Sequence, residues 1–238
     1  EMVDGLVGSE MCIRDRQAGY SVNGNQITGS DYGTIFNVFV DSMKAADPSI
    51  KIGAVVFPHD GNYNNWTRRV LQEVENTADF LIIHDYFKRK NNPNNVTFPE
   101  MMIAVSEVQQ DVNNVNSMVS SYTSKPSGYF PIAMTEYNSK TGEREIAMAN
   151  AIFIARVLGE QIKHQIGMSL IWSFQNGLDS YGGDHGITAR NSTIVPKNTP
   201  RPVYFVNRYM NQFFGDKMIW SYSNDTVSYT HLRAHETI

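Results

Sequence analysis

Six residues able to bind or transform a polar ligand stand at or just after the ends of three short apolar runs. They are His84, Tyr86, Glu136, Asn138, Trp172 and Gln175. If the runs are parallel strands of a barrel, these side chains converge at one mouth, because the carboxyl ends of the strands meet there. Amides and carboxylates bind hydroxyl groups, and an aromatic ring accepts the flat apolar face of a sugar. The set therefore predicts a carbohydrate site.

The apolar runs alternate with longer segments of helical periodicity. We expect strands at residues 51–57, 78–83, 130–135 and 168–174. We expect helices at residues 31–46, 66–74, 98–122, 143–164 and 202–214. Such alternation indicates a parallel α/β fold. A Rossmann-type sheet has the same alternation, but no strand is followed by a glycine-rich phosphate-binding turn, which disfavours dinucleotide and nucleoside-triphosphate binding.

Charge and composition bound the class of protein. The 238 residues carry a net charge of −4, and the pI is near 5.9. That balance gives no electrostatic reason to expect a nucleic-acid partner. The apolar content of 41% fits a globular chain, and no apolar run is long enough to cross a membrane, so we expect no membrane partner.

The two ends of the chain are related at the level of DNA. One coding sequence for residues 7–15 (VGSEMCIRD) has a reverse complement that translates as VSYTHLRAH, the sequence of residues 227–235. That DNA also resembles a transposase adaptor used to prepare sequencing libraries. We therefore interpret residues 1–16 and 227–238 as adaptor-derived. The only cysteine, Cys12, falls within this artefact, so we expect no disulfide or thiolate metal site in the native segment.

The native segment resembles a known family. Residues 131–138 (PIAMTEYN) are similar to the seventh-strand nucleophile motif of the large clan of (β/α)8 retaining glycosidases, and residues 169–174 (SLIWSF) resemble their eighth strand. Residues 83–86 (IHDY) resemble the sixth strand and residues 51–56 (KIGAVV) the fifth. Within the clan, residues 47–55 and the loop 182–186 look most like α-L-arabinofuranosidase-like enzymes.

This resemblance implies a fold and a division of the chain. We expect the C-terminal half of a TIM (β/α)8 barrel, with strands five to eight. Residues 17–215 would be a partial catalytic domain, and residues 216–226 would begin an appended C-terminal β domain. The true N-terminus would be missing, so localisation stays open, with secretion and a periplasmic location as the candidates.

The resemblance also implies roles for individual residues. Glu136 would be the catalytic nucleophile of a retaining O-glycoside hydrolase, with Tyr86 donating a hydrogen bond to it. The remaining substrate-binding candidates are His84, Asn138, Trp172, Gln175, Asp184 and His185. The acid/base Glu of the clan follows the fourth strand, which would lie upstream of Asp31 and is not matched here. We therefore expect the chain alone to be inactive, and we expect no cofactor and no metal.

Two alternatives remain open. The barrel could be a non-catalytic carbohydrate-binding protein, or a β-xylosidase- or agarase-type member of the same clan. The identity of the residue that ends the fourth strand would discriminate between enzyme and binder.

Overall fold

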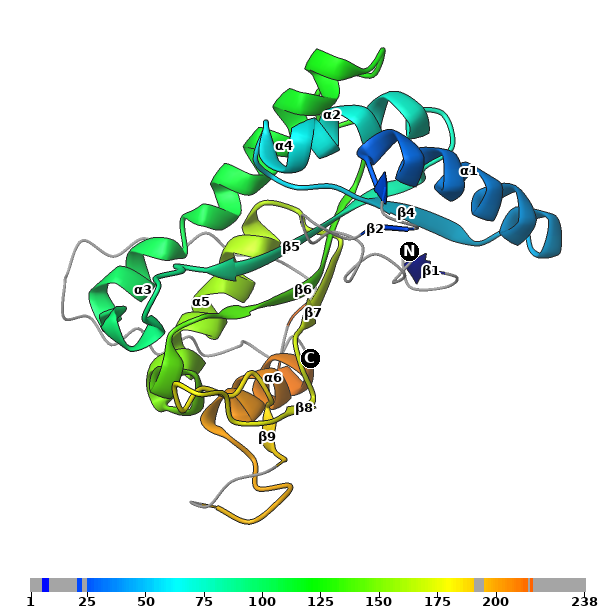
Figure 1. Cartoon of the computed structure of the whole chain (residues 1–238). Helices are drawn as coiled ribbons and strands as arrows, with labels where there is room; N and C mark the ends of the chain where they lie inside the picture. Colours follow the sequence, from blue (N-terminus) through cyan, green and yellow to red (C-terminus); the bar gives the residue numbers. More distant parts are fainter. Residues whose placement is uncertain (1–5, 9–20, 23–24, 191–194, 214, 216–238) are drawn as a thin grey trace.

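The computed structural model describes residues 6–8, 21–22, 25–190, 195–213 and 215. A five-stranded parallel sheet is its main feature (Figure 1), with the strand order β1-β4-β5-β6-β7. The strands are β1 (Leu6–Gly8), β4 (Lys51–Val55), β5 (Phe80–Phe87), β6 (Ile132–Ser139) and β7 (Met168–Ile171).

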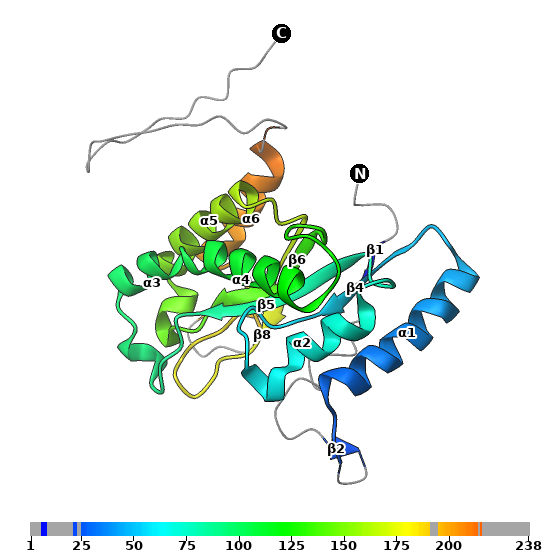
Figure 2. The ribbon, with the colours of Figure 1, turned by 90° about the horizontal axis from the view of Figure 1, so that it is seen from above.

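Helices connect the strands and follow the curve of the sheet in chain order. They are α1 (Gly29–Ala46), α2 (Asn62–Val74), α3 (Phe98–Ala104), α4 (Glu107–Tyr122), α5 (Met148–Lys163) and α6 (Pro202–Phe213), with 3-10 turns η2 (Pro93–Asn95) and η3 (Gly142–Ile146). Contacts join α1 to α2, α2 to α4, α4 to α5 and α5 to α6 (Figure 2). Two small pairs, β2 (Ser21–Val22) with β3 (Asn25–Gln26) and β8 (Gln175–Asn176) with β9 (Thr188–Ala189), complete the described structure.

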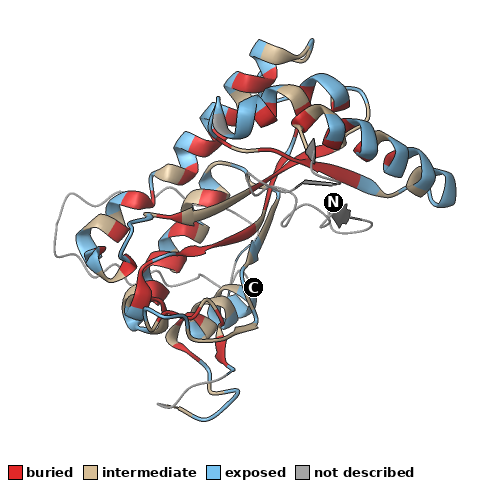
Figure 3. Ribbon diagram, viewed as in Figure 1, coloured by how far each residue is buried: buried red, intermediate tan, exposed pale blue. Residues whose placement is uncertain are grey.

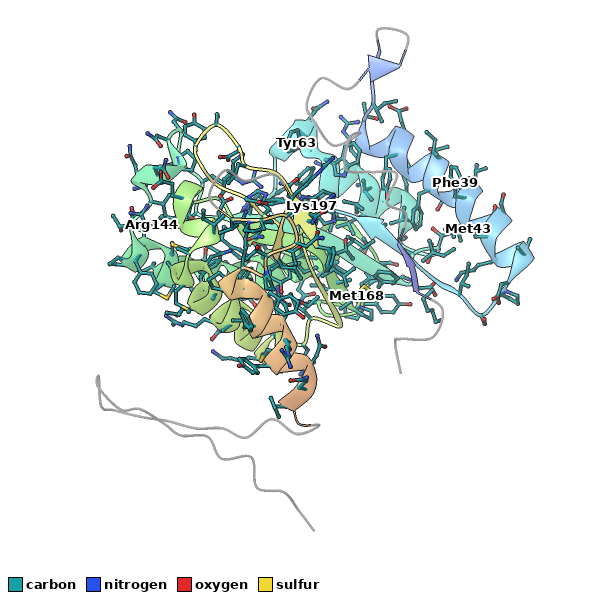
Figure 4. All side chains as sticks on the ribbon, turned by 90° about the horizontal axis from the view of Figure 1, so that it is seen from below. Phe39, Met43, Tyr63, Arg144, Met168 and Lys197 are labelled. Carbon is teal, nitrogen blue, oxygen red and sulfur yellow. The ribbon has the colours of Figure 1, made fainter. Side chains whose placement is uncertain are left out.

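The core lies between the sheet and the helices, where buried residues concentrate on β4, β5 and β6 (Figure 3). Helix α1 illustrates how the sequence places a helix on this sheet. Thr28 and Asp31 form a capping box at its start, and Tyr32, Phe36 and Val40 recur at helical spacing and are buried. Phe39 and Met43 lie on the same helix (Figure 4), and Met43 packs against the edge of the core.

The sequence predicted the parallel α/β architecture, and the structure confirms it. One correction concerns the helix expected over 98–122, which is interrupted between Ala104 and Glu107. There the hydrogen bonds tighten to an i→i−3 pattern: the Ser106 N–H and hydroxyl both donate to the Ile103 carbonyl, at 3.2 and 2.9 Å. A side chain that bonds the local backbone competes with the regular helix, and this breaks it in two.

A second correction concerns the helix expected from 143, which begins only at Met148. Residues 142–146 form η3 instead, and Ala147 is extended, with φ −101° and ψ 170°. The Glu145 carboxylate accepts hydrogen bonds from the N–H groups of Thr141 and Gly142, at 2.8 and 3.2 Å. These bonds fold the chain back on itself before α5 starts.

Residues expected to be adaptor-derived contribute little to the described structure. Leu6–Gly8 form β1 and pair parallel to β4 at the sheet edge. The expected C-terminal β domain at 216–226 and the second adaptor segment at 227–238 lie outside the described residues. Across the described part of the chain, no helix is both long and apolar enough to cross a membrane.

Strand β6 has one residue more than β5 can pair. Ile83 lies opposite Met134 and His84 lies opposite Glu136, so Thr135 is the extra residue of a β-bulge. Met134 faces α5, because Gln161 Nε2 donates to its sulfur at 3.0 Å. Strict alternation would turn Glu136 to that same side. The bulge turns it to the other face of the sheet.

Candidate functional site

Glu136 is the centre of the site. It is only 5% exposed, near the carboxyl end of β6. The Tyr86 hydroxyl donates a hydrogen bond to Glu136 Oε1, and His84 Nδ1 lies 2.8 Å from Glu136 Oε2. A buried carboxylate is stabilised only if its oxygens are matched by donors, and here each oxygen has a side chain of β5 beside it.

The bulge accounts for the way His84 is held. Because Thr135 and Glu136 share one register position, both contact the same imidazole. Thr135 Oγ1 lies 2.8 Å from His84 Nε2, on the side opposite Glu136. Fixing one ring nitrogen orients the other, so Thr135 positions the nitrogen that faces Glu136.

A pocket of about 700 Å³ opens over this group. Four of the predicted site residues line it: Glu136, His84, Tyr86 and His185. The remaining wall comes from β5, from the segments that follow β4, β5 and β6, and from the starts of α2 and α4, namely Phe57, Pro58, His59, Tyr63, Asp85, Lys88, Arg89, Glu107 and Lys140. The volume is in the range of small-molecule sites.

The other predicted residues lie outside the pocket lining. Asn138 is fully buried, and its Nδ2 donates to the carbonyls of Trp172 and His185, at 2.6 and 3.1 Å. It thereby ties β6 to the segment after β7. The Trp172 side chain is 39% exposed, and Gln175 Nε2 donates to the Ala189 carbonyl, which links β8 to β9.

Asp184 and His185, the two site candidates in the loop 182–186, have different surroundings in the structure. Asp184 is buried, its Oδ2 lies 2.5 Å from Arg201 Nη2, and its Oδ1 accepts from the Gly186 N–H. These contacts hold the loop against the start of α6. His185 instead turns to the pocket, and its ring centroid lies 5.1 Å from that of Tyr86.

Two buried carboxyl groups next to the site were missed by the sequence analysis. Glu145 falls at the start of the helix expected over 143–164, where a charged residue usually faces solvent, yet it is 2% exposed and its Oε2 lies 3.4 Å from His185 Nε2. Asp111 is 1% exposed on α4. Asp111 could have been found from its spacing, because it stands between Val108, Val112 and Val115 on the apolar stripe of that helix. No comparable signal marks Glu145.

Asp111 forms a hydrogen-bonded pair with Asp85, which faces α4 from β5. Burial, together with the negative charge of Glu107, raises the pKa of Asp85 to about 7. Burial and the charge of Asp85 raise the pKa of Asp111 to about 8. Burial also raises the pKa of Glu107, against the opposing effect of Lys88. The pair therefore retains a proton near neutral pH.

No protein-family model matches this chain, and no curated protein sequence matches it. Solved structures do. A GH51 α-L-arabinofuranosidase from Thermotoga petrophila aligns with a TM-score of 0.58 and 18% identity, over 79% of this chain and 37% of that one. A GH51 arabinofuranosidase from Xanthomonas axonopodis aligns with a TM-score of 0.58 and 12% identity, over 87% and 42%.

A solved structure from another glycoside hydrolase family also matches. A family 44 endoglucanase from Clostridium acetobutylium aligns with a TM-score of 0.50 and 15% identity, over 67% of this chain and 39% of that one. This chain thus spans about two fifths of the length of these structures. At these identities the matches define the fold: the described residues form part of an α/β TIM barrel.

Proposed function

We propose that this chain carries the nucleophile half of a retaining O-glycoside hydrolase, with Glu136 as the nucleophile. The observation that carries the proposal is the environment of this carboxylate. It is buried in the carboxyl-terminal half of strand β6, flanked by Tyr86 and His84, and it lines a pocket. Catalytic groups of TIM barrels stand at this end of the strands, and the structural neighbours are glycosidases.

The reaction has two steps. Glu136 would attack the anomeric carbon as the bond to the leaving oxygen breaks, and water would then hydrolyse the glycosyl-enzyme. Tyr86 holds Oε1, which leaves Oε2, beside His84, as the oxygen for attack. Both steps use a second carboxyl group about 5–5.5 Å from the first, as acid and then as base. We assign that role to no described residue, because Asp85 is turned toward α4 and bonded to Asp111.

For the substrate we propose an α-L-arabinofuranoside. The support is the resemblance in the sequence together with the GH51 arabinofuranosidases among the structural neighbours. Trp172 and His185 would contact the sugar ring and its hydroxyls. Because they follow β7 in one segment, Asn138 would fix their backbone relative to Glu136.

A labelling experiment tests the nucleophile without relying on the acid/base group. An arabinofuranosyl donor with a dinitrophenolate leaving group departs without protonation, and a fluorine beside the anomeric carbon slows the second step. We expect one sugar to become attached to the peptide that contains Glu136, detected by mass spectrometry. We expect no sustained turnover of an ordinary aryl arabinofuranoside.

Two variants control the experiment. Glu136→Gln should abolish the label, whereas Glu143→Gln, at an exposed position seven residues further along, should keep it. Label on another residue, or none on the wild-type chain, would refute the assignment. Saccharide binding without any label would instead favour the non-catalytic carbohydrate-binding barrel.

A further inference from the structure

Two lysines directly follow the strands that carry the catalytic group. Lys88 comes just after β5, which holds His84 and Tyr86, and Lys140 comes just after β6, which holds Glu136. Phe87 pairs with Ser139, so Lys88 and Lys140 stand next to each other at the ends of adjacent strands. Both line the pocket.

Two like charges side by side on neighbouring strands oppose folding. A third cation, Arg89, joins them: its Nε donates to the Tyr86 carbonyl at 3.1 Å, and its guanidinium carbon lies 5.5 Å from the centroid of the Tyr86 ring. Lys88 also has a positive φ of 53°, a backbone conformation that lysine seldom adopts. Such strain, when it occurs beside a pocket, is a common mark of a functional position.

Among the described residues, these three cations lack close acidic partners. No carboxylate in the described ranges lies within ion-pair distance of Lys88, Arg89 or Lys140, although several other lysines and arginines of the chain form such pairs. Two carboxyl groups interact with these cations over a longer range: Glu107, which accepts a hydrogen bond from the Lys88 backbone, interacts with Lys88, and Asp85 interacts with Arg89. Burial raises the pKa of both groups, which disfavours their charged forms.

We propose that Lys88, Arg89 and Lys140 form a subsite for an anionic substituent of the polysaccharide, a uronate carboxylate or an ester sulfate. The subsite lines the same pocket as Glu136 and lies just past the ends of β5 and β6, so it would hold a sugar next to the one attacked by Glu136. Lysine and arginine are the natural partners of such groups, with arginine able to bind two oxygens at once. The proposal rests on the proposed function and narrows its substrate class to charged saccharides.

The test compares three trisaccharides of similar size by isothermal titration calorimetry with the full chain. One is a neutral arabino-trisaccharide, one a trigalacturonate and one a sulfated galacto-trisaccharide. At low salt we expect at least one anionic ligand to bind about tenfold more tightly than the neutral one. Raising the salt should remove most of that advantage, because exposed charges are screened over about 8 Å at physiological ionic strength.

Variants test whether the lysines of the subsite cause the tighter binding of the anionic ligand. Lys140→Gln and Lys88→Gln should each weaken binding of the anionic ligand by about fivefold, as expected for a solvent-exposed ion pair, and leave the neutral ligand unaffected. Lys125→Gln removes the same charge outside the pocket, where its ammonium donates to Asn76, and should change neither. The preferred anionic ligand distinguishes uronate from sulfate.

The experiments distinguish a failure of the anionic subsite from a failure of the proposed function. Equal binding of neutral and anionic ligands, or equal effects of Lys140→Gln and Lys125→Gln, overturns the anionic subsite while the proposed function stands. If no saccharide binds and the labelling experiment also fails, the proposed function falls and the subsite falls with it.

Discussion

Replacing Asp111 with asparagine should stabilise the chain clearly more at pH 8 than at pH 5. Asp111 and Asp85 share a hydrogen bond in a buried site, and burial raises both pKa values well above the ordinary 3.8. A carboxyl group whose pKa is raised by folding stabilises the folded state below its unfolded pKa. That stability is lost as the pH rises toward the folded pKa.

The magnitude follows from the pKa of the pair. One pKa unit corresponds to about 1.4 kcal/mol. If Asp111, the more strongly shifted group of the pair, keeps its proton up to a pKa of about 8, compared with 3.8 when unfolded, its contribution falls by about 3 to 4 kcal/mol between pH 5 and pH 8. The amide of the substituted side chain carries no charge at any of these pH values, so most of this fall should disappear.

Urea unfolding at pH 5, 6.5 and 8 measures the effect as a free energy of unfolding. Asp41→Asn, at an exposed position on α1, removes a charge of the same kind and serves as the control. The comparison between the two variants cancels titrations elsewhere in the chain. Parallel pH profiles for Asp111→Asn and Asp41→Asn would refute the reasoning.

Two further predictions concern backbone packing and the ends of the chain. Gly142 has φ +60°, and a Cβ there would collide with Asn94 Oδ1, so Gly142→Ala should lower the free energy of unfolding by at least about 1 kcal/mol. Gly159→Ala, within α5 and with nothing in reach of the new methyl, should raise it by up to about 1 kcal/mol, and a loss at this position would contradict the argument. Removing residues 1–16 and 227–238 should leave the melting temperature unchanged if they are adaptor-derived, whereas a clear decrease would mean that β1 stabilises the sheet.

The sequence predicted the site best where the chemistry coincides with a strand end. His84, Tyr86 and Glu136 follow apolar runs that are buried by the helices, and the parallel register brings their side chains together. Placing them at one edge of the sheet needs only the positions of the strands, which hydrophobic runs mark clearly. The bulge that turns Glu136 to the pocket has no such mark in the sequence. His185 also reaches the pocket, although its loop has no periodicity and its placement depends on contacts made far along the chain.

Other features depend on tertiary contacts that no local pattern records. Glu145 is buried because it folds η3 back and approaches His185, and its sequence neighbourhood looks like an ordinary charged helix start. Asp184 resembled a ligand-binding loop residue, yet it pairs with Arg201, seventeen residues later. The break between α3 and α4 depends on one serine that bonds its own backbone.

The extra residue in β6 has a consequence for anyone who redesigns this barrel. Designed strands are usually idealised to regular alternation, and from Met134 such a pattern would send position 136 into the layer beneath α5. An idealised version could be well packed and thermally robust while its carboxylate pointed away from the pocket. A design must therefore keep the extra residue between Met134 and Glu136. This residue, as much as the identity of the glutamate, determines whether the carboxylate faces the pocket.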